Sequence, residues 1–341
     1  MPDADIGAHG WMWVGIESTY GTPLDPSDGD AALGIYVPIL SETLMYTEPD
    51  RYYSEQIRQE TMHSDVKQSY YHVEGEIVME VDARYMPYFM FASRHTTTKT
   101  GAATPWTYSS VPAGTGTTYP GGTAKGLSIA IVRDNVGFLY SGCIVGQYAF
   151  TVENGVLRVT MNMLGLNEAP FAGAVPVPTF AAPDLFGADS HGVYVAAAGT
   201  TPTFTAFDTT FNGFTETVNH NAEPQNRITR ARSASYIKYG ITEVSYDTEL
   251  DFVSRAEYDN FVNLVKRALR FESINPGGVG GSWAAATSGF RITNYNTVYN
   301  TYETSLSGMA DLVMATVNGR AIAIAGGSGY KMECISPTNI P

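Results

Sequence analysis

Residues 73–82 read Val73-Glu74-Gly75-Glu76-Ile77-Val78-Met79-Glu80-Val81-Asp82 and, apart from Val78, alternate between two kinds of side chain. Because side chains alternate across a strand, its even positions form an acidic face and its odd positions an apolar face. A second stretch, Thr242-Glu243-Val244-Ser245-Tyr246-Asp247-Thr248-Glu249-Leu250-Asp251-Phe252, alternates in the same way. A shift of 171 residues (247 − 76) places Glu76 on Asp247 and Glu80 on Asp251. The sequence therefore predicts two half-buried strands, one in each half of the chain.

Further similarities follow the same order in both halves. Glu48-Pro49 is echoed by Glu223-Pro224, the segment 126–129 by 289–292, and Asn154-Gly155 by Asn318-Gly319. Each Asn-Gly pair predicts a hairpin with a type I′ turn, because both central residues of that turn need a positive φ. The ordered set favours an internal duplication over chance similarity between β segments of biased composition.

The duplication predicts a mainly β protein with two tandem domains of the sandwich or partial-barrel kind, each flanked by one α-helix. We expect an extended N-terminal arm at 1–34 and domains at 35–170 and 204–341. Between the domains we expect a linker rich in Ala, Pro and Gly at 171–203, part of which could form strands of its own. The loop 95–125 is rich in Thr, Gly and Pro. Trp11 and Trp13 lie two apart, so on an extended arm both point the same way, toward the protein's own core or a neighbouring subunit.

One helix is expected after each acidic strand. The first lies at 85–92 and is short, because Pro87 is tolerated only in a first helical turn. The second begins with the capping box 254–257, and apolar residues at helical spacing continue it to Leu269.

Composition narrows the classes of function. The chain has 341 residues and a formal charge of −14, which argues against nucleic-acid binding through a basic surface. Its two cysteines, Cys143 and Cys334, are predicted to be separate thiols in a reducing compartment rather than a disulfide. The N-terminus lacks the pattern of a signal peptide, and no apolar run reaches the ~20 residues of a membrane span.

Signatures of catalysis and of metal or cofactor binding are missing from the sequence, so the chain is not expected to be an enzyme. No P-loop, HExxH, GxSxG or CxxC motif occurs, and the six histidines are scattered. Asp25, Asp28 and Asp30 resemble the start of a calcium loop, but Tyr36 stands where an EF-hand needs its glutamate.

The alternating acidic residues of the two predicted strands, at 74–82 and 243–251, are the most informative feature of the sequence, and we call each set an acidic row. Their simplest reading is the solvent face of a half-buried strand. Neither row contains Lys or Arg, however, although like charges on one strand are mildly destabilising. We therefore favour a functional, uniformly negative surface over plain solvation and over a pair of catalytic carboxylates.

The sequence also resembles a known family, the major tail proteins that form the tail tube of long-tailed (siphovirus-type) bacteriophages. The resemblance rests on 15–23 (GIESTYGTP), on 36–44 (YVPILSETL), and on the order acidic strand, short helix, Gly/Thr-rich loop and late strands. It implies a structural virion protein that is assembled in the host cytoplasm. Such subunits form six-fold rings, and the stacked rings make a tube for DNA ejection into the host.

With two domains per chain, the resemblance implies a trimeric, pseudo-hexameric ring without cofactors. The partners would be other copies of the chain and the tail-tip or baseplate, tape-measure and tail-terminator proteins. DNA would pass without specific binding, because the lumen would be lined by acidic side chains. The lumen set is Glu74, Glu76, Glu80, Asp82, Glu243, Asp247, Glu249 and Asp251. Residues 52–72, the loop 95–125 and the N-terminal arm would make contacts between rings, and Trp11 and Trp13 would anchor the arm on a neighbouring subunit.

A rival hypothesis comes from another class of protein. A secreted or particle-surface β-sandwich could recognise host glycans through an aromatic platform made by Trp106, Trp283 and the many tyrosines.

Overall fold

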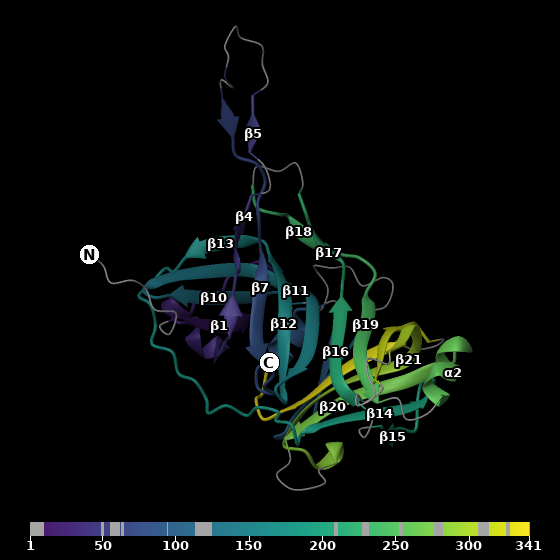
Figure 1. Ribbon diagram of the computed structural model, residues 1–341. Coiled ribbons are helices and arrows are strands. Elements are labelled where there is room, and N and C mark those ends of the chain that lie inside the picture. The colour runs from purple at the N-terminus through teal and green to yellow at the C-terminus, as the bar shows by residue number, and fades with distance from the viewer. Residues whose placement is uncertain are drawn as a thin grey trace.

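The computed structural model describes residues 10–48, 51–54, 62, 65–93, 95–112, 125–207, 211–226, 232–251, 255–275, 282–305, 314–324 and 328–340. These residues form a mainly β structure with two short α-helices, and the named strands pair with one another antiparallel throughout (Figure 1). The fold class predicted from the sequence is therefore confirmed as mainly β.

In the described part of the first half, up to Pro170, there are thirteen strands and one α-helix. These are β1 (Trp11–Ile16), β2 (Gly34–Val37), β3 (Ser41–Glu42), β4 (Met45–Thr47), β5 (Tyr52–Tyr53), β6 (Val66–Lys67), β7 (His72–Glu80), α1 (Met86–Phe91), β8 (His95–Thr100), β9 (Trp106–Pro112), β10 (Leu127–Arg133), β11 (Val136–Glu153), β12 (Val156–Gly165) and β13 (Asn167–Pro170).

The second half, over its described residues, contains ten strands and one α-helix. These are β14 (His191–Ala197), β15 (Thr205–Ala206), β16 (Phe211–Asn219), β17 (Ala222–Gln225), β18 (Tyr236–Tyr239), β19 (Glu243–Asp251), α2 (Ala256–Val262), β20 (Arg267–Asn275), β21 (Ser288–Ser305), β22 (Met314–Ala321) and β23 (Tyr330–Ser336).

The two halves pair their strands in the same order. In the first half the order is β2-β1-β10-β11-β12-β7, with β3 and β4 on the outer edge of β7. In the second half it is β15-β14-β20-β21-β22-β19-β16. The long strands β11 and β21 have 18 residues each, and each takes a late short strand, β13 or β23, beside its first part.

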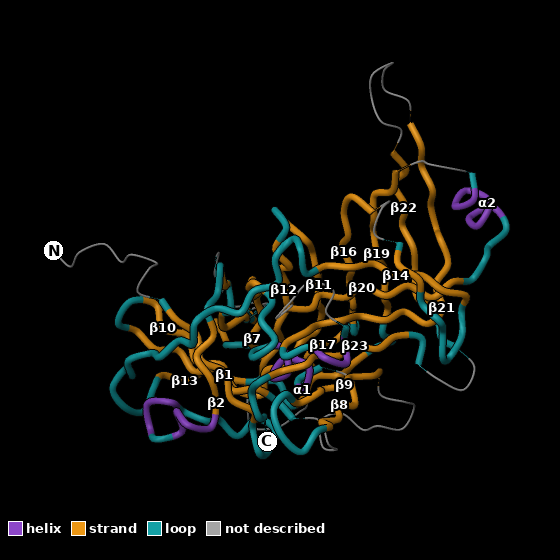
Figure 2. Tube along the Cα trace, turned by 90° about the horizontal axis from the view of Figure 1, so that it is seen from below, coloured by secondary structure: helices purple, strands orange, loops and turns teal. Residues whose placement is uncertain are grey.

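Two strand pairings join the halves. The second part of β11 pairs with β16 between Gln147–Thr151 and Thr215–Asn219. On the other layer, β9 pairs with β23 between Trp106–Ser110 and Met332–Ser336. A shared core cluster runs through both halves, and α1 lies within it, with Met86 and Phe89 fully buried. Figure 2 shows α1 in the middle of the molecule and α2 at its periphery.

Several local predictions are confirmed. The strand at 73–82 is β7, the strand at 242–252 is β19, and Pro87 lies in the first turn of the short helix α1. Asn154 and Gly155, with φ of 52° and 76°, form the turn between β11 and β12. Residues 34–42 hold two short strands, β2 and β3, rather than one continuous strand.

The predicted hairpin at Asn318-Gly319 is wrong. Both residues lie inside β22, where Asn318 pairs with Asp247 and Gly319 with Tyr246. Glycine is required there for a different reason, because a Cβ on Gly319 would lie 2.1 Å from the Tyr246 ring. The dipeptide therefore marks a close side-chain approach rather than a turn.

The second helix also differs from its prediction. Helix α2 ends at Val262, and Leu269, expected on its apolar face, lies in β20 instead. No residue of α2 is buried, and its N-cap is Arg255 without a side-chain bond; Ser254 of the predicted capping box lies outside the described residues. The predicted loop 95–125 contains β8 and β9, and the predicted linker 171–203 contains β14.

The expected N-terminal arm is wrong for residues 11–16. They form β1, which pairs with β10 on one side and β2 on the other, and all six residues are buried. Trp11 and Trp13 do point the same way, into a cluster with Ala130, Val132 and Leu139 of the chain itself. Trp11 is 5% exposed and Trp13 is fully buried, so both side chains pack against the chain's own core.

The sequence motif at 15–23 acquires a structural role through a buried carboxylate. Glu17 accepts hydrogen bonds from the backbone N–H of Gly21 (2.6 Å) and Gly142 (2.7 Å) and from the Ser128 hydroxyl (3.0 Å). Gly21 and Gly142 both have positive φ, which glycine adopts without strain. Burial raises the pKa of Glu17, and these three donors oppose that rise. Glu17 thus holds the turn after β1 against β10 and β11.

Candidate functional site

The candidate site is one face of the sheet that spans both halves. Strands β7, β12, β11, β16, β19 and β22 lie side by side, which Figure 1 shows for the first five. Residues opposite one another in antiparallel strands point to the same side, so the registers define rows across the sheet. One row contains Glu80, Arg158, Thr151, Thr215, Asp247 and Asn318. A parallel row contains Glu76, Asn162, Gln147, Asn219 and Glu243.

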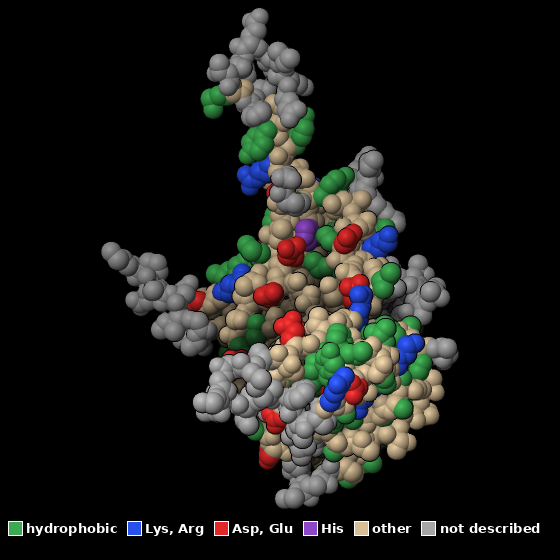
Figure 3. Space-filling view, turned by 45° about the vertical axis from the view of Figure 1, so that its right-hand side comes forward, with side chains coloured by type: hydrophobic (Ala, Val, Ile, Leu, Met, Phe, Trp, Pro, Cys, Tyr) green, Lys and Arg blue, Asp and Glu red, His purple; other side chains and the backbone are tan. Residues whose placement is uncertain are grey.

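These rows bring the two predicted acidic stretches onto the same face. On β7 the alternate residues Val73, Ile77 and Met79 are fully buried, whereas Glu74 and Glu76 are exposed. On β19 the residues Val244, Tyr246 and Leu250 are buried, whereas Glu243, Asp247 and Glu249 are exposed. The predicted division of both strands into an acidic and an apolar side is confirmed. Figure 3 shows acidic side chains spread over the body below the β5–β6 hairpin.

Asp82 does not belong to this face. Strand β7 ends at Glu80, so the alternation stops before Asp82, whose side chain is only 2% exposed. Its carboxylate forms an ion pair with Arg84 and accepts a hydrogen bond from the backbone N–H of Asp184. A buried carboxylate needs such partners to offset the loss of hydration. The other seven predicted carboxylates share the face defined by the rows.

The face also carries two cations that the sequence reading did not include. Arg158 on β12 pairs with Glu153, and Arg320 on β22 lies 2.7 Å from Glu243. They are contributed by the strands that pair with β7 and β19, so no single acidic stretch could reveal them. Exposed pairs of this kind add only ~0–1 kcal/mol each. The centre of the face, on β11 and β16, is neutral and carries threonine, alanine and amide side chains.

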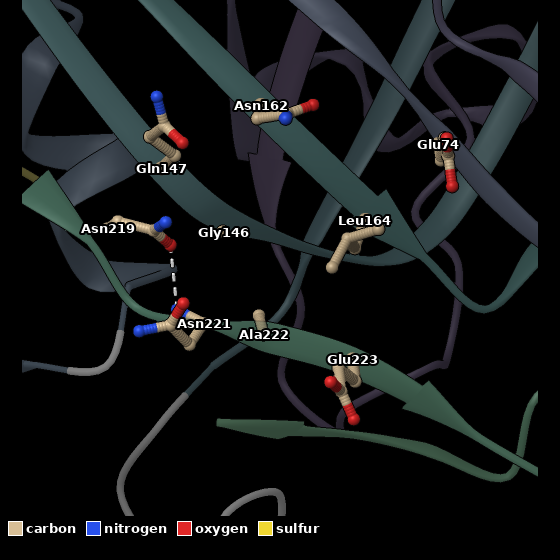
Figure 4. Close-up of a pocket in the computed structure, with 9 residues that line it drawn as sticks. All are labelled: Glu74, Gly146, Gln147, Asn162, Leu164, Asn219, Asn221, Ala222 and Glu223. Carbon is tan, nitrogen blue, oxygen red and sulfur yellow. Dashed lines mark hydrogen bonds between the residues drawn. The ribbon is translucent and has the colours of Figure 1, made fainter. Parts of the chain in front are cut away.

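A polar cavity of about 300 Å³ opens on this face where the two halves meet. Its nine lining residues come from both halves and include two carboxylates, three asparagines and one glutamine (Figure 4). Gly146, at the bulge of β11, and Asn221, with φ of 46°, shape its floor and rim. The Asn219 amide oxygen accepts a hydrogen bond from the Asn221 N–H (2.8 Å).

A buried carboxyl under the same face was not foreseen. Glu216 of β16 points to the opposite side of the sheet, between Phe150 and Tyr246, and is 0% exposed. The Asn294 amide donates to its Oε1 at 2.9 Å. Burial raises the pKa of Glu216 to about 8, so this carboxyl is mostly protonated at neutral pH.

The described residues hold no group of three or more His, Cys, Asp or Glu side chains placed to bind a metal ion. Cys143 and Cys334 are buried free thiols, as predicted, and burial raises the pKa of both. The fold brings His95 and His220, distant in sequence, to a ring separation of 4.8 Å in the core.

The aromatic platform required by the rival hypothesis is not formed by Trp106 and Trp283. Trp106 lies opposite Ser336 in the β9–β23 pair, while Trp283 packs beside Ile335, whose side chain points to the other side of the strand. Trp283 also lies 4.1 Å from the Arg291 guanidinium. The two tryptophans therefore lie on different faces.

Within the part of the chain that the structure describes, no helix is long and apolar enough to cross a membrane. The fold and the face together define a class: a β protein with an unbroken polar, net acidic sheet face that runs through two similarly paired halves. Residues 8–321 match the family model of phage tail tube proteins. The chain therefore belongs to the phage tail tube protein family and is a component of the virion tail, assembled in the host cytoplasm. A search of curated proteins returned no match.

Proposed function

We propose that this chain polymerises into rings that stack into the tail tube, and that the face of β7, β12, β11, β16, β19 and β22 lines the bore. The observation that carries this proposal is the continuity of that face across both halves. A net negative wall repels the DNA phosphates, so the genome passes during ejection without being held. The chain acts as a structural protein rather than as an enzyme.

The matching pairing order of the halves supports an internal duplication. If each half takes one of six equivalent places around the bore, three chains complete a trimeric, pseudo-hexameric ring. The join between the halves of one chain, β11 with β16, then has a counterpart between chains. That counterpart uses the strands that correspond to β11 and β16 in the opposite halves: β21 of one chain and the β3–β4 edge of the next.

Two β-bulges give the register of the proposed pairing between chains, β21 with the β3–β4 edge. Gln147 and Thr301 each follow a bulge and pair with Asn162 and Asn318 respectively. Asn162 in turn pairs with Glu76, and Asn318 pairs with Asp247. Superposing the two bulges therefore matches Glu76 to Asp247, as the sequence repeat does. The intramolecular pairs Gln147↔Asn219 and Ala149↔Thr217 then become, between chains, Thr301↔Thr47 and Glu303↔Met45.

No described strand of the same chain pairs with the two edges that this register names. Strand β20 pairs with β21 only as far as Thr297, and beyond it Thr301, Glu303 and Thr304 are exposed. On the other edge Met45 is 57% exposed. Pairing open edges between copies also removes the aggregation hazard that unpaired edges present.

The two helices provide independent support. Helix α1 is buried by the second half of its own chain: Tyr239 donates to the Ala92 carbonyl at 3.3 Å, and Met332 and Cys334 share its core cluster. Helix α2 packs on β21 and pairs its Glu257 with Arg267 of β20, but none of its residues is buried. Its end leaves Val262 56% and Leu264 67% exposed, beside the open part of β21. Another chain would cover α2 as the second half covers α1.

Stacking of rings is assigned to the β5–β6 hairpin, which projects far from the body in Figure 1. Tyr52 is 61% and Tyr53 52% exposed on it, and Met62 is 84% exposed. Exposed aromatic and apolar side chains on a projecting hairpin suit insertion against a neighbouring ring. The tail-tip or baseplate, tape-measure and tail-terminator proteins are the further partners that this function requires.

The test uses electron microscopy of the purified chain over a concentration series, with sheared tubes as seeds. We expect stacked rings whose averages show three-fold symmetry and six lobes. Thr304 corresponds to Phe150, whose amide faces β16, so the Thr304 amide faces the neighbouring chain in the proposed pairing. Thr304→Pro should stay unassembled, because proline has no N–H to donate across that pairing. Thr304→Val, which keeps that N–H, should assemble. Wild-type protein that forms no rings even with seeds would refute the tube function.

A further inference from the structure

The edge formed by Leu44 and Tyr46 is closed by side chains of the same chain. The Leu44 N–H donates to Glu42 Oε2 (3.0 Å), and the Tyr46 N–H donates to Glu168 Oε2 (3.1 Å). The Leu44 carbonyl accepts from the Arg133 guanidinium (2.6 Å) and from the Tyr140 hydroxyl (2.9 Å). Thr43, by contrast, donates its N–H to β7, at the Glu76 carbonyl. Backbone groups that an edge strand leaves open are therefore occupied here.

Three of the four closing side chains come from the second layer of the first half. Arg133 ends β10, Tyr140 lies in β11 and Glu168 lies in β13. Arg133 also holds Glu42 through two hydrogen bonds of 2.7 and 2.8 Å, which ties the two layers together at this edge. We call this set, Glu42, Arg133, Tyr140 and Glu168, the edge clamp.

The second half shows the same place without a clamp. There the strand corresponding to β3 and β4 is β16, and it pairs with β11. The strand corresponding to β13 is β23, and it pairs with β9. Asn294, which corresponds to Tyr140, turns its amide to the side chain of Glu216 instead of to a backbone carbonyl. Where a neighbouring half is present, strands replace the bridging side chains.

We propose that the edge clamp is an autoinhibitory contact that keeps the free subunit from polymerising and opens when β21 of a second copy pairs with Thr43–Thr47. The proposal rests on the ring closure proposed above. Opening exchanges side-chain hydrogen bonds for backbone ones, so the closed and assembled states contain similar numbers of bonds. The clamp therefore raises the barrier to unassisted nucleation more than it weakens the finished ring, and growth on an existing ring is favoured.

The experiment measures the lag of unseeded assembly by light scattering for the full chain and for Glu168→Ala. Loss of the hydrogen bond from the Tyr46 N–H should shorten the lag by about fivefold, since such a bond contributes ~1 kcal/mol. Tyr140→Phe, which removes one hydroxyl, is a second variant that retains the ring. Glu153→Ala is the control: it removes an equal charge from an exposed ion pair outside the clamp.

Hydrogen exchange of the Tyr46 amide separates failure of the clamp from failure of the ring. In free Glu168→Ala subunits this amide should lose protection, and in tubes of the same variant it should regain it through pairing with β21. An unchanged lag for both variants while tubes form normally would overturn the clamp and leave the tube. A Tyr46 amide that stays unprotected in Glu168→Ala tubes would overturn both the clamp and the proposed register.

Discussion

Replacing Glu216 with glutamine should stabilise the unassembled subunit at neutral and alkaline pH and have little effect in acid. The Glu216 side chain is fully buried, and Asn294 is the donor to its Oε1. Its Oε2 has no hydrogen-bond partner among the described residues. A glutamine amide keeps the bond to Asn294 and leaves its NH₂ where the protonated acid leaves its OH, so the two side chains are comparable when Glu216 is neutral.

The magnitude follows from the shift of the carboxyl. The pKa of Glu216 rises from its ordinary value of 4.5 to about 8 in the folded chain. Below pH 4.5 the carboxyl is protonated in both states and has no pH-dependent cost. Between pH 4.5 and 8 only the unfolded chain ionises, so stability falls by about 1.4 kcal/mol per pH unit. The loss is roughly 3 kcal/mol at pH 7 and levels off above pH 8.

The assay is urea unfolding of wild type and Glu216→Gln at pH 4.5, 6, 7 and 8, at protein concentrations below assembly. The difference in unfolding free energy should grow with pH in favour of the variant. Glu249→Gln, on the exposed face of the adjacent strand β19, is the matched control and should give a difference that is small at every pH. A Glu216→Gln difference that is constant from pH 4.5 to 8 would show that the carboxyl is not held neutral by burial.

Three further predictions concern assembly and passage. Trp13→Ala should destabilise the free subunit by ~3–5 kcal/mol in thermal or urea unfolding, because it empties a buried site; unchanged stability with lost assembly would instead favour the inter-subunit role. Val262→Asp and Leu264→Asp should leave the subunit folded, by circular dichroism, but block rings seen by electron microscopy, and normal rings would contradict the role of α2. The double variant Glu76→Lys with Asp247→Lys should still assemble, but its tubes should bind DNA in a salt-sensitive way and slow genome ejection. Equal DNA binding by wild-type tubes would remove the argument for an acidic bore.

The sequence by itself determined the features that depend on near neighbours. Alternation decided which side of β7 and β19 is apolar, since successive strand residues must point to opposite faces. Pro87 limited α1 to a short helix because proline suits only its first turn. Asn154-Gly155 gave a hairpin because the strands on both sides could pair directly.

Features that depend on distant partners were decided only by the tertiary structure. Residues 11–16 have the surroundings of an arm, yet they are a central strand because β10, more than a hundred residues later, supplies their partner. Asn318-Gly319 carries a turn signal, but pairing with β19 on one side and β21 on the other holds it in a strand. The same reason governs the candidate site. Each acidic alternation lies within a single strand and can be read from neighbouring residues. Both strands share one face only because β11 pairs with β16 through backbone hydrogen bonds between the halves.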